Sequence, residues 1–248
     1  MNTRLLARGV ATLTLTAGLG LGGSMAVDAA GTTPTPSPTA SPAAPPHPTA
    51  LATLKAHCNV AVQRRLATLG ADDTFVKNSA ALTSGDRTTL EGQISADEQG
   101  LTALDKTIQG DATWQQAWTD CQTIVTGYRV YVLEDPKIHE VIAADGVTKV
   151  DSAFETVIPE LQNLINVSSV SSTVKAQAQA DLNDLKNKVS ASHTSISGVT
   201  PSVINLVPSG WPGNQVDLKS ARQNITTAWT DLGGARTDVN NILTLLGE

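Results

Sequence analysis

Histidine is the side chain that most often binds metals or transfers protons near neutral pH, and three histidines lie outside the proline-rich part of this sequence. They are isolated along the chain, at His57, His139 and His193. His139 and Glu140 begin like the zinc motif HExxH, whose second histidine would fall at position 143. That position is Ala143. The spacing therefore predicts no metal site, and we expect no cofactor.

The two cysteines, Cys58 and Cys121, could supply a nucleophile or a disulfide. His57 stands beside Cys58 and would suit a catalytic thiolate. Cysteines of exported proteins are usually paired, however, and two cysteines allow one intramolecular disulfide. We therefore expect a disulfide between Cys58 and Cys121, which requires their helices to be neighbours with Cα atoms within about 7 Å.

Sequence motifs for other chemistry are absent. There is no glycine-rich phosphate loop, no GxSxG turn and no CxxC pair. Adjacent acidic residues such as Asp72 and Asp73 lack the ligand density of a calcium loop, and we interpret them as charges on a helix surface. The sequence predicts no catalytic residues and therefore a protein that is not an enzyme.

One segment stands out from the ordinary helical composition, GYRVYVLEDPKIHEVIAAD at 127–145. Tyrosine and arginine are favoured at binding hot spots, and here they precede an expected helix break at Pro136. Together with the tryptophan of the loop SGWPGN, the candidate interaction patch consists of Tyr128, Arg129, Tyr131, Lys137, His139 and Trp211. The alternative is that Arg129 is solvated, the tyrosines lie in the core and Trp211 folds back on the helices.

The first 50 residues predict export. Residues 1–30 contain two arginines, an apolar run and small residues that allow cleavage between Ala26 and Ala30, as in a secretory signal peptide. Seven of the 20 residues from 31 to 50 are proline, and most others are Thr, Ser or Ala, which predicts a disordered linker. Residues 51–248 then form the folded domain. We expect no transmembrane segment after cleavage and a secreted or cell-wall-associated protein.

The charge balance excludes one class of partner. The chain has 17 Lys and Arg against 23 Asp and Glu, a formal charge of −6, and shows no basic patch beyond Arg64 and Arg65. An acidic chain of this kind is poorly suited to nucleic acid or to anionic membranes. The expected partner is an unknown protein or envelope component.

Apolar residues recur every three or four positions through most of the domain, which is typical of amphipathic helices. The first stripe predicts one long helix that reaches about Leu82. A second helix is expected to begin at Thr83 or Ser84, with Asp86 in its first turn, and to stop at Gly110.

The segment YRVYVL could be a short strand or the end of a third helix. Thr113 and Gln116 fit a capping box, and apolar residues follow at helical spacing from Trp114 through 128–132 without a break. A strand would need a partner, and the sequence offers no second convincing strand. We therefore predict a continuous helix that ends just before Pro136.

Later helices are expected beyond Pro136, over 171–196, and from a cap at Asn214 to the C-terminus, with Gly146 and Pro159 as points of bending or interruption. Aromatic residues make up only 3% of the sequence, too few for the aromatic and β-branched alternation of a sandwich or barrel. The predicted fold is all-α, an elongated bundle of long antiparallel helices.

Four segments together resemble a group of uncharacterised, exported, helix-rich proteins of actinobacteria: AVQRRLATL, LDKTI, DCQTIVTGYRVYVLEDPK and ARQNITTAWTDLGGARTDVNNIL. The shared features are two cysteines, a YRVYVL..PK segment and a last helix rich in Ala, Arg and Asp. The resemblance covers most of the folded domain. It implies a helical, secreted, coiled-coil-like fold and carries no activity.

Three classes of function are compatible with these features. The leading hypothesis is a non-catalytic secreted or cell-envelope helical protein that acts as a spacer or a protein-interaction module. The second is a carrier of a small ligand in a cavity between helices. The third is an enzyme of a type that the motifs do not identify.

Overall fold

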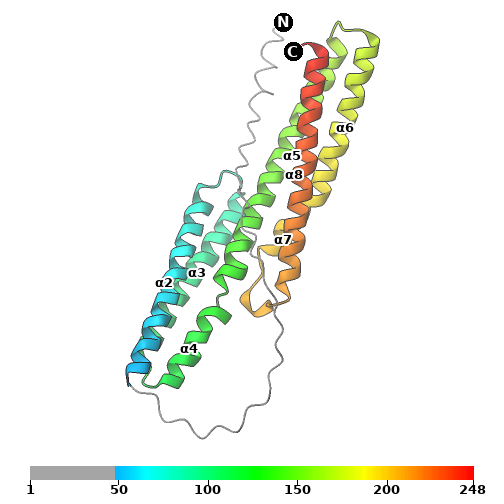
Figure 1. Cartoon of the computed structure of the whole chain (residues 1–248). Coiled ribbons are helices and arrows are strands. Elements are labelled where there is room, and N and C mark those ends of the chain that lie inside the picture. The colour runs from blue at the N-terminus through cyan, green and yellow to red at the C-terminus, as the bar shows by residue number, and fades with distance from the viewer. Residues whose placement is uncertain (1–47) are drawn as a thin grey trace, which may run out of the picture. The chain divides into compact units, whose positions relative to one another are not determined.

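The computed structural model describes residues 48–248, and this part of the chain is helical without any strand (Figure 1). Five helices have 25 residues or more. In chain order the elements are α2 Pro48–Asn78, α3 Ser84–Gly110, α4 Trp114–Thr126, the π-helix η2 Val130–Glu134, α5 Asp135–Val167, α6 Ser172–Ile196, α7 Val199–Val203, the 3-10 turn η3 Pro208–Gly210 and α8 Asn214–Leu246. The all-α prediction is confirmed.

The described residues begin inside the segment that the sequence assigns to the linker. Helix α2 starts at Pro48, three residues before the predicted domain boundary. The predicted signal peptide and residues 31–47 of the predicted linker lie outside the described residues.

The five long helices and the shorter α4 form two groups of three (Figure 1). Helices α2, α3 and α4 pack on one another, and α5, α6 and α8 form the second group, with α6 against α8 as its most extensive contact. Helix α5 also touches α2, so it connects the two groups. Each helix contributes one apolar stripe to the interior, for example Leu90, Ile94, Leu101 and Ile108 of α3.

The hairpin of α2 and α3 forms where the sequence predicts it. Helix α2 ends at Asn78, and Leu82 is buried in the connection rather than inside the helix. Thr83 caps α3 by accepting a hydrogen bond from the Asp86 amide, as predicted. Arg87 then donates hydrogen bonds to the carbonyls of Val76, Lys77 and Ser79. These carbonyls lie at and just beyond the C-terminal end of α2, where helical partners are lacking.

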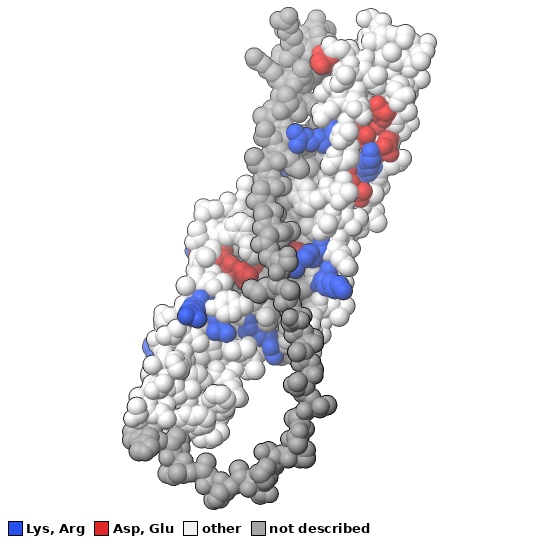
Figure 2. All heavy atoms as spheres, viewed as in Figure 1, with Lys and Arg blue, Asp and Glu red and all other residues white. Residues whose placement is uncertain are grey.

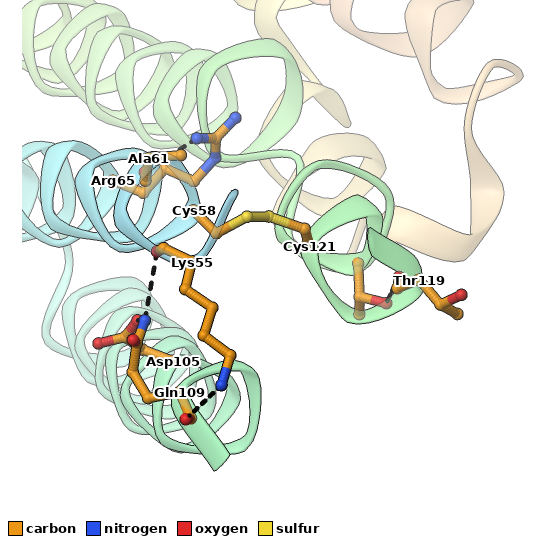
Figure 3. The surroundings of a disulfide bond; sticks show 9 residues. Lys55, Cys58, Ala61, Arg65, Asp105, Gln109, Thr119 and Cys121 are labelled. Atoms are coloured by element: carbon orange, nitrogen blue, oxygen red, sulfur yellow. Dashed lines mark hydrogen bonds between the residues drawn. A yellow bond between two sulfur atoms is a disulfide. The ribbon is translucent and has the colours of Figure 1, made fainter. Parts of the chain in front are cut away.

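Helix α4 begins with the predicted capping box between Thr113 and Gln116. A disulfide joins Cys58 of α2 to Cys121 of α4, with their Cα atoms 5.7 Å apart (Figure 3). The predicted pairing of these cysteines, and with it the packing of the first helix on the third, is confirmed. On the α3 side of α2, Lys55 donates to the carbonyl oxygens of Gln109 and Asp111.

The predicted continuous helix through YRVYVL is wrong. The segment is helical rather than a strand, but α4 already ends at Thr126, with Gly127 as its cap. Arg129 then adopts a left-handed conformation with φ 47°, and the chain re-enters helix through the π-helix η2. Pro136 does not end a helix either. It lies in the first turn of α5, where its missing N–H and fixed φ are tolerated.

Helix α5 is continuous across both of its predicted weak points, Gly146 and Pro159. Pro159 is exposed, as is Glu155, the residue whose carbonyl loses its helical partner there. Helix α6 has the predicted start, with Ser171 as its cap. The predicted cap at Asn214 is wrong, because Asn214 is the first residue of α8 and its side chain donates instead to the Val207 carbonyl.

None of the helices between residues 48 and 248 combines the length and apolar character needed to cross a membrane.

Replacing Cys58 and Cys121 together by alanine should lower the free energy of unfolding by roughly 4 kcal/mol, because the disulfide closes a loop of 63 residues in the unfolded chain. Denaturant titration of both proteins measures the difference. Full alkylation of the oxidised wild type under denaturing conditions without reductant would contradict the bond itself.

Candidate functional site

Ionisable side chains from three helices meet around η2, where the two groups of helices adjoin. We call this set the junction cluster: Asp72 of α2, Asp97 of α3, Glu134 of η2, and Asp135, Lys137 and His139 of α5. Four of its six members are carboxylates. Asp72, Glu134 and Lys137 are buried, which is unusual for charged residues and needs a compensating interaction.

The backbone of η2 sets the position of the cluster. The carbonyl of Arg129 accepts hydrogen bonds from the amides of Val132 and Leu133, and the Asp135 amide donates to the Val130 carbonyl five residues earlier. Such π-helical turns are rare overall, and those that do occur are often at functional sites. The left-handed Arg129 and the wide turn that follows it direct Val130, Leu133 and Glu134 into the interior.

Glu134 and Lys137 form a buried ion pair. The Lys137 Nζ lies 2.5 Å from the Glu134 Oε2, and the side chains are only 2% and 5% exposed respectively. Lys137 Nζ also donates to the Leu206 carbonyl at 3.2 Å, which ties the loop before η3 to α5. Burial raises the pKa of the Glu134 carboxyl, while the charge and hydrogen bond of Lys137 oppose this shift. Lys137 therefore offsets part of the cost of burying the Glu134 carboxylate.

Asp97 of α3 lies close enough to the Glu134–Lys137 pair for both of their charges to act on its carboxyl. Burial and the negative charge of Glu134 raise the pKa of its carboxyl to about 6, and Lys137 lowers it in part. Tyr128 is close to Asp97, and its pKa is raised by burial and by the Asp97 charge. A single lysine thus lies near two carboxylates from different helices.

Asp72, Asp135 and His139 form the outer part of the junction cluster. Asp72 is 4% exposed, so its interpretation as a surface charge is wrong. Burial and the charge of Asp135 raise the pKa of the Asp72 carboxyl to about 7. The His139 Nε2 lies 3.5 Å from the Asp135 Oδ1, and that hydrogen bond raises the pKa of the imidazole. The ring of Phe75 packs on His139 with centroids 4.9 Å apart.

A second feature of the same region is an exposed apolar surface on α4 and η2. Four of the eight large hydrophobic side chains that are exposed between residues 48 and 248 belong to this short stretch: Trp118, Val125, Tyr131 and Val132. Trp114 stacks on Trp118 with centroids 5.3 Å apart. We call these five residues the aromatic face. Figure 2 shows charged side chains of both signs scattered over the visible face of the described helices, with uncharged surface between them.

The predicted interaction patch does not form one surface. Lys137 cannot take part in a surface patch, because its side chain is buried. Its ammonium group is paired with the Glu134 carboxylate. His139 belongs to the junction cluster. Tyr128 is half-buried against α3, where a Cβ on Gly100 would approach its hydroxyl oxygen to 2.5 Å.

Three members of the predicted patch take part in cation–π contacts, Arg129 and Trp211 with each other and Tyr131 with Arg65, which lies outside the predicted patch. The guanidinium of Arg129 lies 5.3 Å from the Trp211 ring centroid, and its Nε donates to the Pro208 carbonyl. Trp211 is half-buried, as expected if it folds back on the helices. Tyr131 is 46% exposed, not in the core, and Arg65 stacks over its ring at 4.9 Å.

Sequence reasoning missed the carboxylates that define the cluster. Asp72 and Asp97 stand at positions where the apolar stripes of α2 and α3 require a core residue, between Leu69 and Val76 and between Ile94 and Leu101. An acidic residue at a core position is a signal for a buried polar site. Asp135 was missed as a neighbour of His139 although it stands four residues earlier, on the same helix face.

No protein-family model, curated protein or solved structure matches the chain.

Replacing Lys137 by methionine should lower the free energy of unfolding by about 3–5 kcal/mol, because Glu134 is left buried without its partner. Replacing both residues, Lys137 by methionine and Glu134 by leucine, should recover most of that loss. Denaturant titration of the two single variants and the double variant gives the coupling free energy. Simple additivity of the two single effects would show that the pair is not formed.

The raised pKa of Asp97 makes the stability depend on pH. Its pKa is 3.8 ordinarily and about 6 in the folded protein, so in this window the folded protein retains a proton that the unfolded chain has lost. The free energy of unfolding should therefore fall as pH rises from about 4 to 6. In Asp97→Asn that contribution disappears, and the variant should gain stability over the wild type across the window.

Denaturant titrations at pH 4, 5, 6 and 7 measure this difference, with Glu98→Gln as a control that removes the adjacent carboxylate of α3. A constant offset between Asp97→Asn and wild type at all four pH values would contradict the assignment.

Proposed function

We propose that this protein is a non-catalytic interaction module of the cell exterior, which binds a partner protein through the aromatic face. The observation that carries the proposal is the concentration of exposed apolar side chains on α4 and η2, with a stacked pair of tryptophans at one end. Exposed aromatic side chains near arginine are enriched at protein-binding hot spots. The complementary partner surface is an apolar segment that covers Trp118 and Val125.

The support of α4 suits this role. The disulfide between Cys58 and Cys121 fixes α4 to α2, and Ala117 and Ile124 anchor its inner side. Trp114 and Trp118 are therefore presented on a helix whose position is covalently restrained. A rigid surface of this kind loses little conformational entropy when a partner binds.

The spacer component of the hypothesis rests on helix α5. Its 33 residues correspond to about 50 Å of continuous helix at 1.5 Å per residue, and it packs against both groups of helices. An elongated form would hold the aromatic face away from a point of attachment at either end. The predicted signal peptide and linker, together with the disulfide, favour action outside the cell.

The proposal predicts partner capture that depends on Trp118. The full chain, immobilised through its C-terminus, is incubated with cell-envelope extract and compared with Trp118→Ser. A matched control is Val167→Ser, which removes an even more exposed apolar side chain, at the C-terminal end of α5. Proteins retained by wild type and by Val167→Ser should be lost from Trp118→Ser, while circular dichroism shows that all three are folded.

Equal capture by Trp118→Ser and wild type would contradict a docking role for the aromatic face. Capture of no protein above an uncoupled resin would contradict the interaction module as a whole. Saturable retention of a small molecule in place of a protein would support the carrier hypothesis instead.

A further inference from the structure

We propose that Asp72, Asp135 and His139 form a binding site for one divalent transition-metal ion, with Zn²⁺ as the best match. Each side chain offers one ligand atom, and these three atoms lie within 4.8 Å of one another. The site is independent of the aromatic face, and the interaction module does not require it.

The spacing of the donor atoms fits metal coordination with small side-chain adjustments. The His139 Nε2 and Asp135 Oδ1 are 3.5 Å apart. Zinc bonds of 2.0–2.2 Å in a tetrahedron place neighbouring ligand atoms about 3.4 Å apart. Asp135 and His139 stand one turn apart on α5, so the helix sets their separation, and Asp72 approaches from α2 as the third ligand.

Asp72 provides a second and independent indication of a ligand. Its side chain is almost fully buried, yet the Oδ2 atom has no hydrogen-bond donor among residues 48–248. A buried carboxylate oxygen without a donor is costly unless a cation or a proton occupies its lone pairs. The charged neighbours of Asp72 do not supply this donor. Asp135 and Glu134 carry the same charge as Asp72, and only the charge of His139 favours its ionised form.

The available positive charge is also insufficient. Within the described part of the chain, neither Asp72 nor Asp135 forms an ion pair with a lysine or an arginine, and the one basic side chain within 4 Å of Asp135 is the His139 imidazole. A divalent ion between the two carboxylates would neutralise both charges at once. The imidazole would then bind the ion as a neutral ligand.

The donor set favours zinc over the alkaline-earth ions. One imidazole nitrogen with two carboxylate oxygens suits Zn²⁺, whereas Mg²⁺ and Ca²⁺ prefer oxygen ligands alone. Cys58 and Cys121 do not compete, because their sulfur atoms are joined in the disulfide. Asp135 and His139 are partly exposed, so a fourth coordination position is open to water or to a donor atom from a partner.

Isothermal titration of the full chain with Zn²⁺ tests the proposal. The protein carries no polyhistidine tag and is freed of metal by a chelator that is then removed. We expect one Zn²⁺ per chain and a melting temperature that rises with the Zn²⁺ concentration. His139→Gln and Asp135→Asn change partly exposed side chains, so they should fold normally and bind Zn²⁺ at least tenfold more weakly.

His57→Gln is the matched control, because it removes an exposed histidine elsewhere on α2, and it should bind like the wild type. Asp72→Asn keeps the shape of the buried side chain and should also weaken binding at least tenfold. Absence of Zn²⁺ binding by the wild type would overturn the proposal and leave a proton as the occupant of Asp72. Unchanged affinity in His139→Gln, or loss of binding in His57→Gln, would overturn the assigned ligands.

Discussion

The arrangement of the helices depends on the left-handed backbone conformation of Arg129. For a residue with a Cβ this conformation costs about 1–2 kcal/mol. The turn ends α4 and starts η2. Helix α4 before it is joined to α2 by the disulfide, whereas α5 after it packs mainly on α6 and α8. The turn therefore lets the chain pass from one group of helices to the other. The Arg129 side chain helps to hold the turn by donating to Pro208 and stacking over Trp211. Both contacts reach across from the loop that precedes α8.

This backbone break determines where charge is buried. The π-helical turn directs Glu134 inward, and Lys137, one turn later, meets it at 2.5 Å. Asp72 and Asp97 approach from α2 and α3. Desolvation of three carboxylates, Asp72, Asp97 and Glu134, opposes folding, and only the Lys137 contact of Glu134 offsets it with a buried ion pair. The same burial leaves Asp72 with an oxygen that lacks a donor and so creates the metal-binding potential of the site.

Much of the fold could be predicted from the sequence, since periodic stripes and capping signals act locally. Thr83 and the Thr113–Gln116 capping box identify two helix starts, and the pairing of Cys58 with Cys121 follows from their number. The break at Arg129 could not be predicted in this way, because the apolar spacing runs through it and arginine has no preference for a left-handed conformation. Pro136 is equally compatible with a helix end and with a first turn, and the tertiary contacts decide between them.

The candidate site was partly visible in the sequence. The segment YRVYVLEDPK does contain Glu134, Asp135 and Lys137. Their partners Asp72 and Asp97 stand 37 or more residues earlier, and their proximity depends on how the helices pack. Considered alone, an acidic residue on an apolar stripe indicates only a weak point of a helix. Considered together, acidic residues at the core positions of two helices predict a buried polar layer.

The left-handed turn at Arg129, on which the arrangement of the helices depends, is tested most directly by comparing the stabilities of Arg129→Gly and Arg129→Ala. Both variants lose the same side-chain contacts, so their difference reports on the backbone alone. In a left-handed conformation the glycine variant should be the more stable by about 1 kcal/mol, measured by denaturant titration. In an uninterrupted helix the alanine variant would be the more stable by about 1 kcal/mol, and that result would contradict the account.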